Sequence, residues 1–384
     1  MTASTRVVTI VGTRPEIIRL SRVIARLDAS CHHRLVHTGQ NYDPELSQVL
    51  FRDLQIRDPD DYLAVGAETL GEMLGDAFRG IEKFLARERP DAVLVLGDTN
   101  SALAALMAKR MGITVFHMEA GNRCYDANVP EEINRKILDH FADVNLVYTE
   151  HARRNLLAEG LSPQRIYLTG SPLREVLTHY EKSIQSSAIL AQLNLESRGY
   201  FLLSLHREEN VDDPDRLLSL LDGVEALSRH HGLPVIATTH PRTRKRIAEL
   251  DDSAQERAIQ FLPPFGYLDY VALQQGARCV ISDSGTISEE SAMLGFPAIT
   301  TRDSIERPEA MDTGSIIVAG ATEAGLVDAV DAVLQAWDVG DRAELPADYA
   351  VRNCSQRVVN LVVSLSKLQP VWDGLHRPKR GQAR

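Results

Sequence analysis

Cysteine is scarce in this 384-residue sequence, which contains only Cys31, Cys124, Cys279 and Cys354. The four residues are widely separated, and no pair has the spacing of a disulfide framework or of a zinc-binding motif. The sequence therefore predicts reduced thiols, a cytoplasmic location and no bound metal.

Long apolar runs are also missing. No stretch approaches the ~18–20 consecutive apolar residues of a membrane span. The opening segment, MTASTRVVTIVG, has only a short apolar run and lacks the pattern of a signal peptide. With 44% hydrophobic and 25% charged residues, the composition is that of a soluble globular protein, and we expect no membrane partner.

Positive charge is in deficit. Lys and Arg number 42 against 53 Asp and Glu, which gives a formal net charge of −11. This balance argues against a nucleic-acid-binding surface, and the short basic end, HRPKRGQAR, is expected to be a solvated tail. The deficit does not exclude a phosphate-bearing ligand, because a few arginines and a helix N-terminus can hold one locally.

Strand-like runs alternate with helical patterns along the whole chain, which predicts parallel sheets covered by helices. The strands are expected at Val7–Gly12, Arg34–Gly39, Ala92–Gly97, Thr114–Glu119, Val144–Thr149, Tyr200–His206, Pro234–His240, Arg278–Asp283 and Pro297–Arg302.

The length suits two domains, and the strands fall into two series. We therefore predict an α/β fold with two Rossmann-like domains facing a cleft. The first domain covers residues 1–172, and the second covers residues 173–354. The helix over residues 355–368 is expected to return to the first domain, ahead of a basic tail over residues 369–384.

Two turns between a strand and a helix could bind phosphate. In the first, GTRPE, backbone N–H groups and the helix dipole favour an anion, and Arg14 and Arg19 add positive charge. An ordinary turn with surface arginines explains this motif equally well. There is no GxGxxG sequence, so the turn gives no support for a dinucleotide cofactor.

The second turn lies in SDSGTISEES, where Gly285 permits close approach of the backbone. Thr286 and Glu289 have the spacing of a capping box. Glu290 lies beside the apolar face of the helix and needs a polar partner if it is partly buried. That partner is either a ribose hydroxyl of a nucleotide or Arg307.

Acidic residues follow two strands and begin one helix. Asp98 and Glu119 each come directly after a strand, where open α/β sheets place their chemistry. In the helix that begins at Pro130, we expect Ile133, Ile137 and Phe141 to face the core. Glu131 and Arg135 would then lie on the opposite, cleft-facing side.

Three converging carboxylates suit proton removal from carbon and its return, because crowding and burial raise carboxyl pKa values towards neutrality. The alternative is structural: Asp98 caps a helix, and Glu131 interacts favourably with a helix dipole. His206 and His240 also end strands, where each could contact a phosphate or stabilise a turn.

Eight motifs occur in order along the chain: GTRPEIIRL, TGQNYD, LGDTNS, HMEAGNR, PEEINR, HREEN, SDSGTISEE and RDSIERPEA. Together they resemble the non-hydrolysing UDP-N-acetylglucosamine 2-epimerase family, from about Val7 to Gly314. The resemblance implies a glycosyltransferase-B-like fold that binds UDP mainly through its second domain. It also implies anti elimination of UDP to a 2-acetamidoglycal, followed by syn return, without a nicotinamide, a metal or another cofactor.

The resemblance also implies roles for individual residues. Acid–base chemistry would fall to Asp98, Glu119 and Glu131, and we include His206 among the catalytic candidates. UDP would be held by Arg14, His206, Ser284, Gly285, Glu290 and Arg307, to which we add Arg19, Thr286 and, as a residue that could stack on the base, Tyr270.

Some positions depart from the family pattern. Arg19 stands where the family often has Lys, Thr286 replaces a second Gly, and Phe265 stands where better-known members often carry Gln. TGQNYD replaces the TGQH-type sequence associated with allosteric binding of UDP-N-acetylglucosamine. The first three changes alter predicted UDP contacts, and the last argues against that allosteric activation.

Within the family, HTGQNYD, GDTNS and HMEAGNRCYDANVPEEINRKI look most like the branch that makes UDP-N-acetyl-L-fucosamine or related 6-deoxy-L-hexosamines for surface polysaccharides. We therefore expect a UDP-2-acetamido-2,6-dideoxy-L-hexose or UDP-N-acetylglucosamine as substrate, and a homodimer. The alternatives are a hydrolysing 2-epimerase, a glycosyltransferase of the same fold, and a catalytically silent UDP-sugar sensor.

Overall fold

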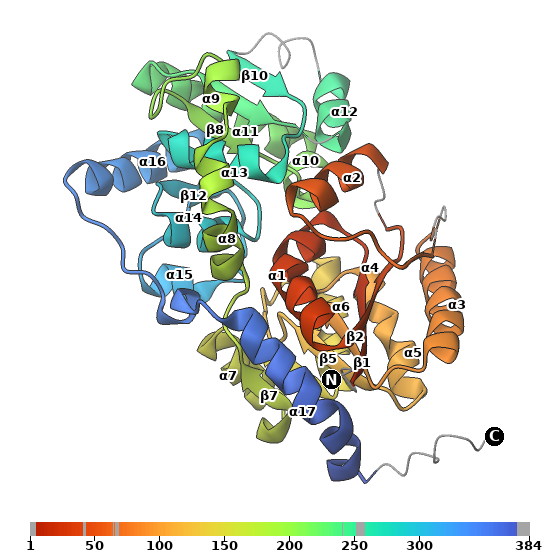
Figure 1. Cartoon of the computed structure of the whole chain (residues 1–384). Coiled ribbons are helices and arrows are strands. Elements are labelled where there is room, and N and C mark those ends of the chain that lie inside the picture. Colours follow the sequence, from red (N-terminus) through yellow and green to blue (C-terminus); the bar gives the residue numbers. More distant parts are fainter. Residues whose placement is uncertain are drawn as a thin grey trace. The chain divides into compact units, whose positions relative to one another are not determined.

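The computed structural model describes residues 5–40, 44–63, 65, 69–239, 241–250 and 258–374. The chain forms two compact units, Met1–Thr178 with Asp348–Arg384, and His179–Ala347 (Figure 1). The chain passes from the first unit to the second inside helix α8 (Leu173–Gln185) and returns to the first unit in the 3-10 helix Ala347–Ala350. The domain boundaries predicted from the sequence lie six residues before the first change and seven residues after the second.

The first unit is built on a seven-stranded parallel sheet with the order β3-β2-β1-β4-β5-β6-β7. Its strands are β1 (Arg6–Val11), β2 (His32–His37), β3 (Asp61–Tyr62), β4 (Ala92–Leu96), β5 (Thr114–Met118), β6 (Val144–Val147) and β7 (Ile166–Leu168).

Helices cover both faces of this sheet. They are α1 (Arg14–Ser30), α2 (Pro44–Asp53), α3 (Leu70–Glu88), α4 (Asn100–Leu103), α5 (Ala105–Arg110), α6 (Pro130–Phe141), α7 (Glu150–Ala158) and α17 (Cys354–Trp372). Apolar side chains of α3, α4, α5 and α6 pack on one face of β1, β4 and β5. Helix α17 lies beside α1, and Arg26 donates a hydrogen bond to Ser355 Oγ at 2.9 Å (Figure 1).

The second unit repeats this architecture with a six-stranded parallel sheet of order β10-β9-β8-β11-β12-β13. Its strands are β8 (Phe201–Ser204), β9 (Val235–Thr238), β10 (Ile259–Leu262), β11 (Cys279–Ser282), β12 (Ala298–Thr300) and β13 (Ile317–Val318).

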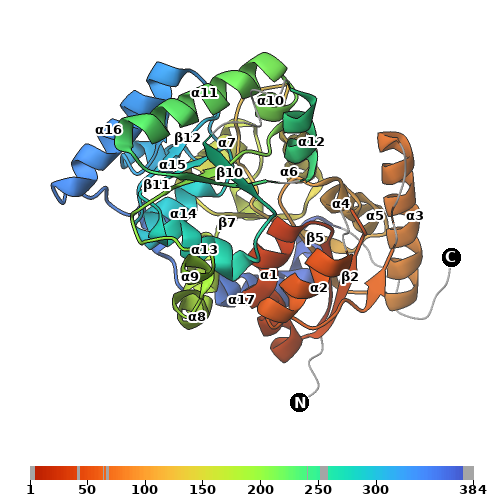
Figure 2. The same ribbon diagram turned by 90° about the horizontal axis from the view of Figure 1, so that it is seen from above.

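Two long helices, α11 (Pro214–His231) and α16 (Glu323–Asp338), pack side by side on one face of the second sheet (Figure 2). The opposite face is covered mainly by α9 (Ile189–Gln192), α13 (Tyr267–Gly276), α14 (Ile287–Leu294) and α15 (Pro308–Asp312). The remaining helices are α10 (Glu208–Val211) and α12 (Pro241–Glu249).

Each sheet has one point where the strand order reverses direction. It lies between β1 and β4 in the first sheet and between β8 and β11 in the second. Loops that leave neighbouring strands on the two sides of such a point diverge to opposite faces of the sheet, which leaves room for a ligand beyond the strand ends. The four loops at these two points begin at residues 12, 97, 205 and 283.

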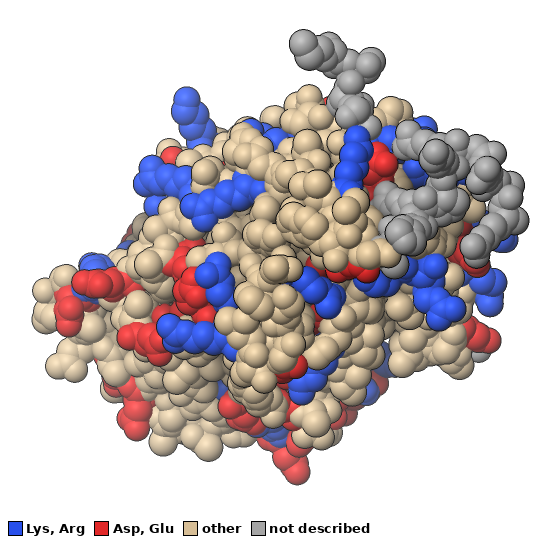
Figure 3. All heavy atoms as spheres, turned by 90° about the horizontal axis from the view of Figure 1, so that it is seen from below, with Lys and Arg blue, Asp and Glu red and all other residues tan. Residues whose placement is uncertain are grey.

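The predicted α/β class is correct, and all nine predicted strands are present. Among the described residues, no helix is long and apolar enough to cross a membrane. On the face shown in Figure 3, positive and negative side chains are interspersed over the described surface.

Candidate functional site

The first group of candidate residues lies where β4 and β5 end. Leu96 and Met118 are paired in the sheet, so Asp98 and Glu119 follow directly at the same edge. A Cβ atom placed on Gly97 would lie 3.9 Å from Glu119 Oε2, which shows how closely the second carboxylate approaches the first loop. The ends of these two loops therefore lie close together, and the convergence of all three acids on one substrate stays a prediction.

Glu119 has an unusual backbone conformation, with φ of +66°. This left-handed region is uncommon for a residue with a long side chain, and such residues concentrate at functional sites. Its carboxylate receives two polar contacts, from Arg19 Nη1 at 3.2 Å and from Asn122 Nδ2 at 3.3 Å. Glu119 thus combines a strained backbone with a carboxylate that is held in a defined orientation.

Each acid at this edge is paired with a buried arginine. Arg19, which is only 4% exposed, forms the ion pair with Glu119, and Arg135 Nη2 lies 2.6 Å from Asp98 Oδ2. The structure therefore places Arg19 against a candidate catalytic acid, although the sequence analysis assigns it to UDP. Asp98 does not cap the following helix, because Thr99 is the N-cap of α4.

The predicted orientation of helix α6 is wrong for Ile133 and Ile137, whereas Phe141 packs against the apolar core as predicted. Ile133 and Ile137 are 54% and 46% exposed, whereas Glu132, Arg135 and Asp139 are buried with Leu138. The helix buries a polar face because its charges are paired inside the unit. Arg135 contacts both Asp98 and Glu132, and Asn134 donates a hydrogen bond to the Asp98 carbonyl at 2.8 Å.

Glu131 lies half-buried in the first turn of α6, where a carboxylate interacts favourably with the helix dipole. Its predicted catalytic role and this structural role are compatible, because the first turn begins next to the loop that carries Glu119 and Asn122. Glu131 stays a candidate on these grounds.

A buried network under these loops was not predicted. His117 Nε2 donates to the Gly97 carbonyl at 2.8 Å, and His117 Nδ1 lies 2.9 Å from Asp139 Oδ1. Asp139 also accepts from Gly121 N and pairs with Arg123 at 2.8 Å. The network fixes Gly97, which directly precedes Asp98, and Gly121, which follows Glu119 by two residues. The only indication of this network in the sequence was that HMEAGNR and ILDHF carry polar residues at positions expected to be buried in a strand or a helix.

The GTRPE turn already contains a hydrogen-bond acceptor of its own. The buried Glu16 carboxylate accepts hydrogen bonds from Gly12 N (2.9 Å), Thr13 N (2.7 Å), Thr13 Oγ1 (2.8 Å) and Thr99 Oγ1 (2.9 Å). Burial raises the pKa of Glu16 to about 7, against the opposing effect of these hydrogen bonds. The prediction that these N–H groups attract a ligand phosphate is therefore wrong for Gly12 and Thr13. Arg14 is half-buried and stays a candidate.

The second group of candidate residues lies where β8 and β11 end. His206 follows β8, and its backbone N–H and its Nδ1 atom both contact the buried carboxylate of Asp283, at 3.0–3.1 Å. Asp283 also accepts from Arg207 N and Asn210 Nδ2. Burial alone would raise the pKa of Asp283, but the His206 ring and these hydrogen bonds lower it to about 2.

This arrangement fixes the His206 ring while leaving 44% of its side chain exposed. Because Nδ1 faces Asp283, the second ring nitrogen is the one that can serve a ligand. Asp283 is a functional candidate that the sequence analysis missed, although it stands inside the SDSGT motif. The sequence feature that could have identified Asp283 was its position, as an acidic residue directly after a buried strand.

Helix α14 begins at Thr286, as predicted, but without a capping box. Thr286 Oγ1 lies 2.9 Å from Ser284 Oγ, and Glu289 pairs with the buried Arg307 at 3.2 Å. Glu290 accepts a hydrogen bond from Gln274 Nε2 at 2.6 Å. The capping box predicted for Thr286 and Glu289 is therefore wrong, and Glu289 is the residue that pairs with Arg307.

Gly285 lies in a narrow space surrounded by charged groups. A Cβ atom at this position would lie 3.3 Å from Glu306 Oε2 and 3.5 Å from both Arg207 Nη2 and Arg302 Nη1. A methyl group here would therefore touch all three charged side chains, and glycine leaves that space open; the φ of Gly285 is not in the left-handed region. Arg207 and Arg302 bring positive charge to the turn, and the sequence analysis did not single out either residue.

The predicted base-stacking residue, Tyr270, lies in α13 and packs against the apolar cluster that includes Phe265. Its hydroxyl interacts with Ser204 and Gln274, and burial, followed by the nearby Glu290 charge, raises its pKa. Tyr270 and Glu290 therefore belong to one polar cluster. Helix α17 runs to Trp372, so the tail predicted over residues 369–384 is wrong for its first residues. His240, residues 41–43 of TGQNYD and the chain from residue 375 onward lie outside the described residues.

Comparison with known proteins gives a consistent result. A family model described as UDP-N-acetylglucosamine 2-epimerase matches residues 25–363. A Pseudomonas aeruginosa protein, UDP-2,3-diacetamido-2,3-dideoxy-D-glucuronate 2-epimerase, is 34% identical over 84% of this chain and 90% of its own length.

Two solved structures are similar over almost the whole chain. The UDP-N-acetylglucosamine 2-epimerase of Rickettsia bellii is 43% identical, with a TM-score of 0.90, and the match covers 96% of this chain and 99% of that one. The Methanocaldococcus jannaschii UDP-GlcNAc 2-epimerase in complex with UDP-GlcNAc and UDP is 35% identical, with a TM-score of 0.86 and coverage of 93% and 99%. These neighbours confirm the glycosyltransferase-B-like fold but do not resolve the predicted branch. The chain therefore belongs to the non-hydrolysing UDP-N-acetylglucosamine 2-epimerase family, whose members are isomerases.

Proposed function

We propose that this protein inverts C2 of an N-acetylhexosamine attached to UDP, without net hydrolysis. The observation that carries the proposal is the pair of acids at the β4–β5 edge. Glu119 is held in a left-handed conformation, and Glu119 and Asp98 each contact a buried arginine. Such pre-positioned carboxylates suit transfer of a proton to and from carbon.

The proposed reaction has two stages. In the first, a carboxylate removes the C2 proton while the bond between C1 and the UDP oxygen breaks, which gives a 2-acetamidoglycal and UDP. In the second, UDP adds back to C1 and a proton returns to C2 on the opposite face. Inversion requires proton transfer on both faces of the sugar, so two acid–base groups are needed. Asp98, Glu119 and Glu131 are the candidates, with His206 as a further one.

We propose that the second unit holds UDP around the Ser284–Thr286 turn. Arg207 and Arg302 lie within 3.5 Å of the space beside Gly285, which suits a diphosphate. His206, oriented by Asp283, can donate to a phosphate oxygen or assist the departure of UDP. Glu290 can accept from ribose hydroxyls, and Arg14 and Arg307 remain candidates for the diphosphate.

The experiment that tests this function is NMR of the purified protein with a panel of UDP-N-acetylhexosamines in D₂O. We expect the epimer to carry deuterium at C2, with UDP released transiently. Glu119→Gln should abolish deuterium incorporation, whereas Glu181→Gln, at an exposed position, should not affect it. Epimerisation without deuterium at C2 would contradict the elimination mechanism. Free sugar as the main product would indicate a hydrolysing epimerase, and UDP-sugar binding without turnover would indicate a sensor.

For the substrate, we propose a UDP-2-acetamido-2,6-dideoxy-L-hexose, with L-talo to L-fuco as our first choice, in preference to UDP-N-acetylglucosamine. The loop between Glu119 and Glu131 carries the sequence that resembles the 6-deoxy branch, and Asn122 of this loop contacts Glu119. An apolar wall for the C6 methyl would leave the 6-hydroxyl of glucosamine unpaired. That would cost about 1–3 kcal/mol, or roughly ten- to a hundred-fold in discrimination.

The comparison to make is kcat/KM for the two substrates under one set of conditions. Equal or better use of UDP-N-acetylglucosamine would refute the choice of branch and leave the 2-epimerase proposal intact. With a 6-deoxy product, the enzyme would serve surface polysaccharide synthesis. We further propose that it acts in the cytoplasm as a homodimer, which equilibrium ultracentrifugation would test.

A further inference from the structure

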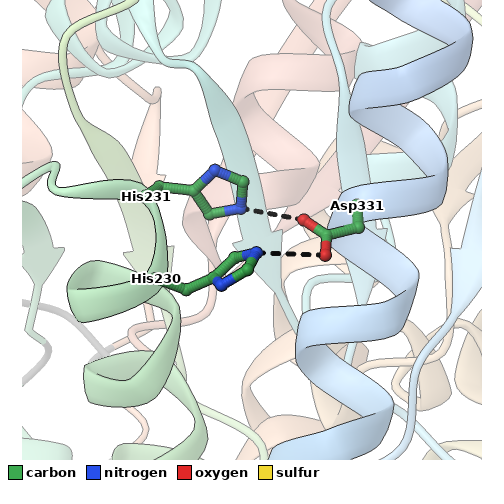
Figure 4. A group of neighbouring side chains, drawn as sticks. All are labelled: His230, His231 and Asp331. Atoms are coloured by element: carbon green, nitrogen blue, oxygen red, sulfur yellow. Dashed lines mark ion pairs between the residues drawn. The ribbon is translucent and has the colours of Figure 1, made fainter.

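A cluster of possible metal ligands lies in the second unit, among residues that the proposed reaction does not use. His230 and His231 are the last two residues of α11, and Asp331 lies on α16. His230 Nε2 lies 3.3 Å from Asp331 Oδ2, and His231 Nε2 lies 3.0 Å from Asp331 Oδ1 (Figure 4). One ligand atom from each residue lies within 4.8 Å of the others.

Packing holds the two helices and the His231 ring in place. A Cβ atom on Gly223 of α11 would lie 2.5 Å from Leu326 Cδ1 and 3.1 Å from Glu323 Cα, so the two helices are in close contact one to two turns away from the cluster. The His231 ring also packs edge-on against Phe201 of β8, with 5.3 Å between the ring centroids. Ligands fixed in this way lose little conformational freedom when they bind an ion.

The contact between His231 and Asp331 is not a regular hydrogen bond. His231 Nε2 is buried and, among the described residues, has no partner in hydrogen-bonding geometry, although Asp331 Oδ1 is only 3.0 Å away. A tetrahedral zinc ion with bonds of about 2.0–2.1 Å places neighbouring ligand atoms roughly 3.3 Å apart. Each ring nitrogen faces a different oxygen of the Asp331 carboxylate (Figure 4), at a distance close to this value, so Asp331 can serve the ion through either oxygen.

Electrostatics at this position also favours a cation. The cluster lies at the C-terminus of α11, where the helix dipole is negative, and Asp331 contributes a carboxylate. Two imidazoles and one carboxylate are typical ligands of zinc and related transition metals, with the remaining position open to water. Calcium and magnesium prefer sites made only of oxygen atoms.

We propose that His230, His231 and Asp331 bind one zinc-type divalent cation, which links α11 to α16 and stabilises the second unit. The site has no part in epimerisation. Strand β9 begins at Val235, four residues after His231, so the cluster lies at the edge where the strands begin. The Ser284–Thr286 turn follows the end of β11, at the opposite edge of the sheet. A metal at the cluster therefore cannot touch a ligand at that turn.

The test is isothermal titration calorimetry of the EDTA-treated full-length protein with ZnCl₂, together with thermal unfolding in the presence and absence of zinc. We expect one zinc ion per chain with a Kd of about 10 µM or tighter. Zinc should also raise the unfolding temperature by several degrees, because it binds the folded state. His230→Gln and Asp331→Asn should each weaken binding by at least ten-fold and remove the thermal shift.

His140→Gln is the matched control, because His140 is also exposed and pairs with a carboxylate, Glu159, at 3.3 Å, but within the described part of the chain it belongs to no group of three possible metal ligands. This variant should bind zinc like the wild type. His230 is 55% exposed at its side chain, so His230→Gln should fold normally even if replacement of His231 disturbs its packing. A Kd weaker than about 1 mM in the wild type, or equal affinity in His230→Gln and the wild type, would overturn the proposal. Turnover of UDP-sugar should be the same with and without EDTA, so this result is independent of the proposed function.

Discussion

The buried carboxylate of Glu16 should make the stability of the protein fall with rising pH. Its pKa is raised from 4.5 to about 7 in the folded protein, mainly by burial. Between these two values the folded state binds more protons than the unfolded state, so stability is highest below pH 4.5 and falls as pH rises through 7. For a shift of this size, the free energy of unfolding should fall by about 2.5 kcal/mol between pH 5 and pH 8.

Glu16→Gln removes this titration while keeping the hydrogen bonds. The amide oxygen can take the place of Oε2, which accepts from Gly12 and Thr13, and the amide NH₂ can donate to Thr99 Oγ1 instead of accepting from it. The variant should therefore gain stability relative to the wild type as pH rises.

The assay is guanidinium denaturation of both proteins at pH 5, 6, 7 and 8. Other titrating groups cancel when the two proteins are compared at each pH. Glu72→Gln is the matched control, because Glu72 and Thr69 form the same kind of capping box at the exposed start of α3. If the difference between Glu16→Gln and the wild type stays constant within about 0.5 kcal/mol from pH 5 to pH 8, the reasoning about burial is refuted.

Three further predictions concern the candidate sites. Glu119→Gln and Asp98→Asn should lower turnover by at least ~10²–10⁴-fold with little change in UDP affinity, measured by steady-state kinetics and calorimetry; near-wild-type turnover in both would make these acids structural. Arg14→Ala should weaken UDP binding about ten-fold, since a charge-assisted hydrogen bond contributes roughly 1.5–3 kcal/mol, and unchanged calorimetric affinity would remove Arg14 from the site. Gly285→Ala should weaken UDP binding because the added methyl occupies space beside Arg207, whereas Gly71→Ala, with nothing within 4 Å and no left-handed φ, should leave UDP affinity unchanged.

The sequence predicted the central strands well and missed the strands at the sheet edges. The four strands that were not predicted, β3, β7, β10 and β13, are the outermost strands of the two sheets. A central strand in a parallel sheet is covered on both faces and paired on both sides, so it reads as a continuous apolar run. Edge strands are paired on one side only and are two to four residues long here, which leaves too little apolar pattern to detect.

The sequence predicted which residues lie at the candidate sites better than it predicted their partners. Asp98 and Glu119 lie where strand periodicity places them. The orientation of α6 was wrong because hydrophobic periodicity assumes that charged residues face solvent. Arg135 and Asp139 break this assumption, since each is buried against an opposite charge from a segment distant in the chain. Such pairings depend on the fold and cannot be read from spacing.

Buried charge collects at the point in each sheet where the strand order reverses. A loop that ends a parallel strand exposes backbone N–H groups that need acceptors, and an internal carboxylate is the strongest acceptor available to the chain. Glu16 plays this part after β1, and Asp283 plays it after β8. Each carboxylate also connects the two loops on either side of the reversal point. Glu16 accepts a hydrogen bond from Thr99, in the loop after β4, and Asp283 itself stands in the loop after β11. Each sheet thus fixes the two loops that border its ligand space before any ligand binds. Asp98, Glu119, His206 and Ser284 all belong to loops held in this way or to loops next to them.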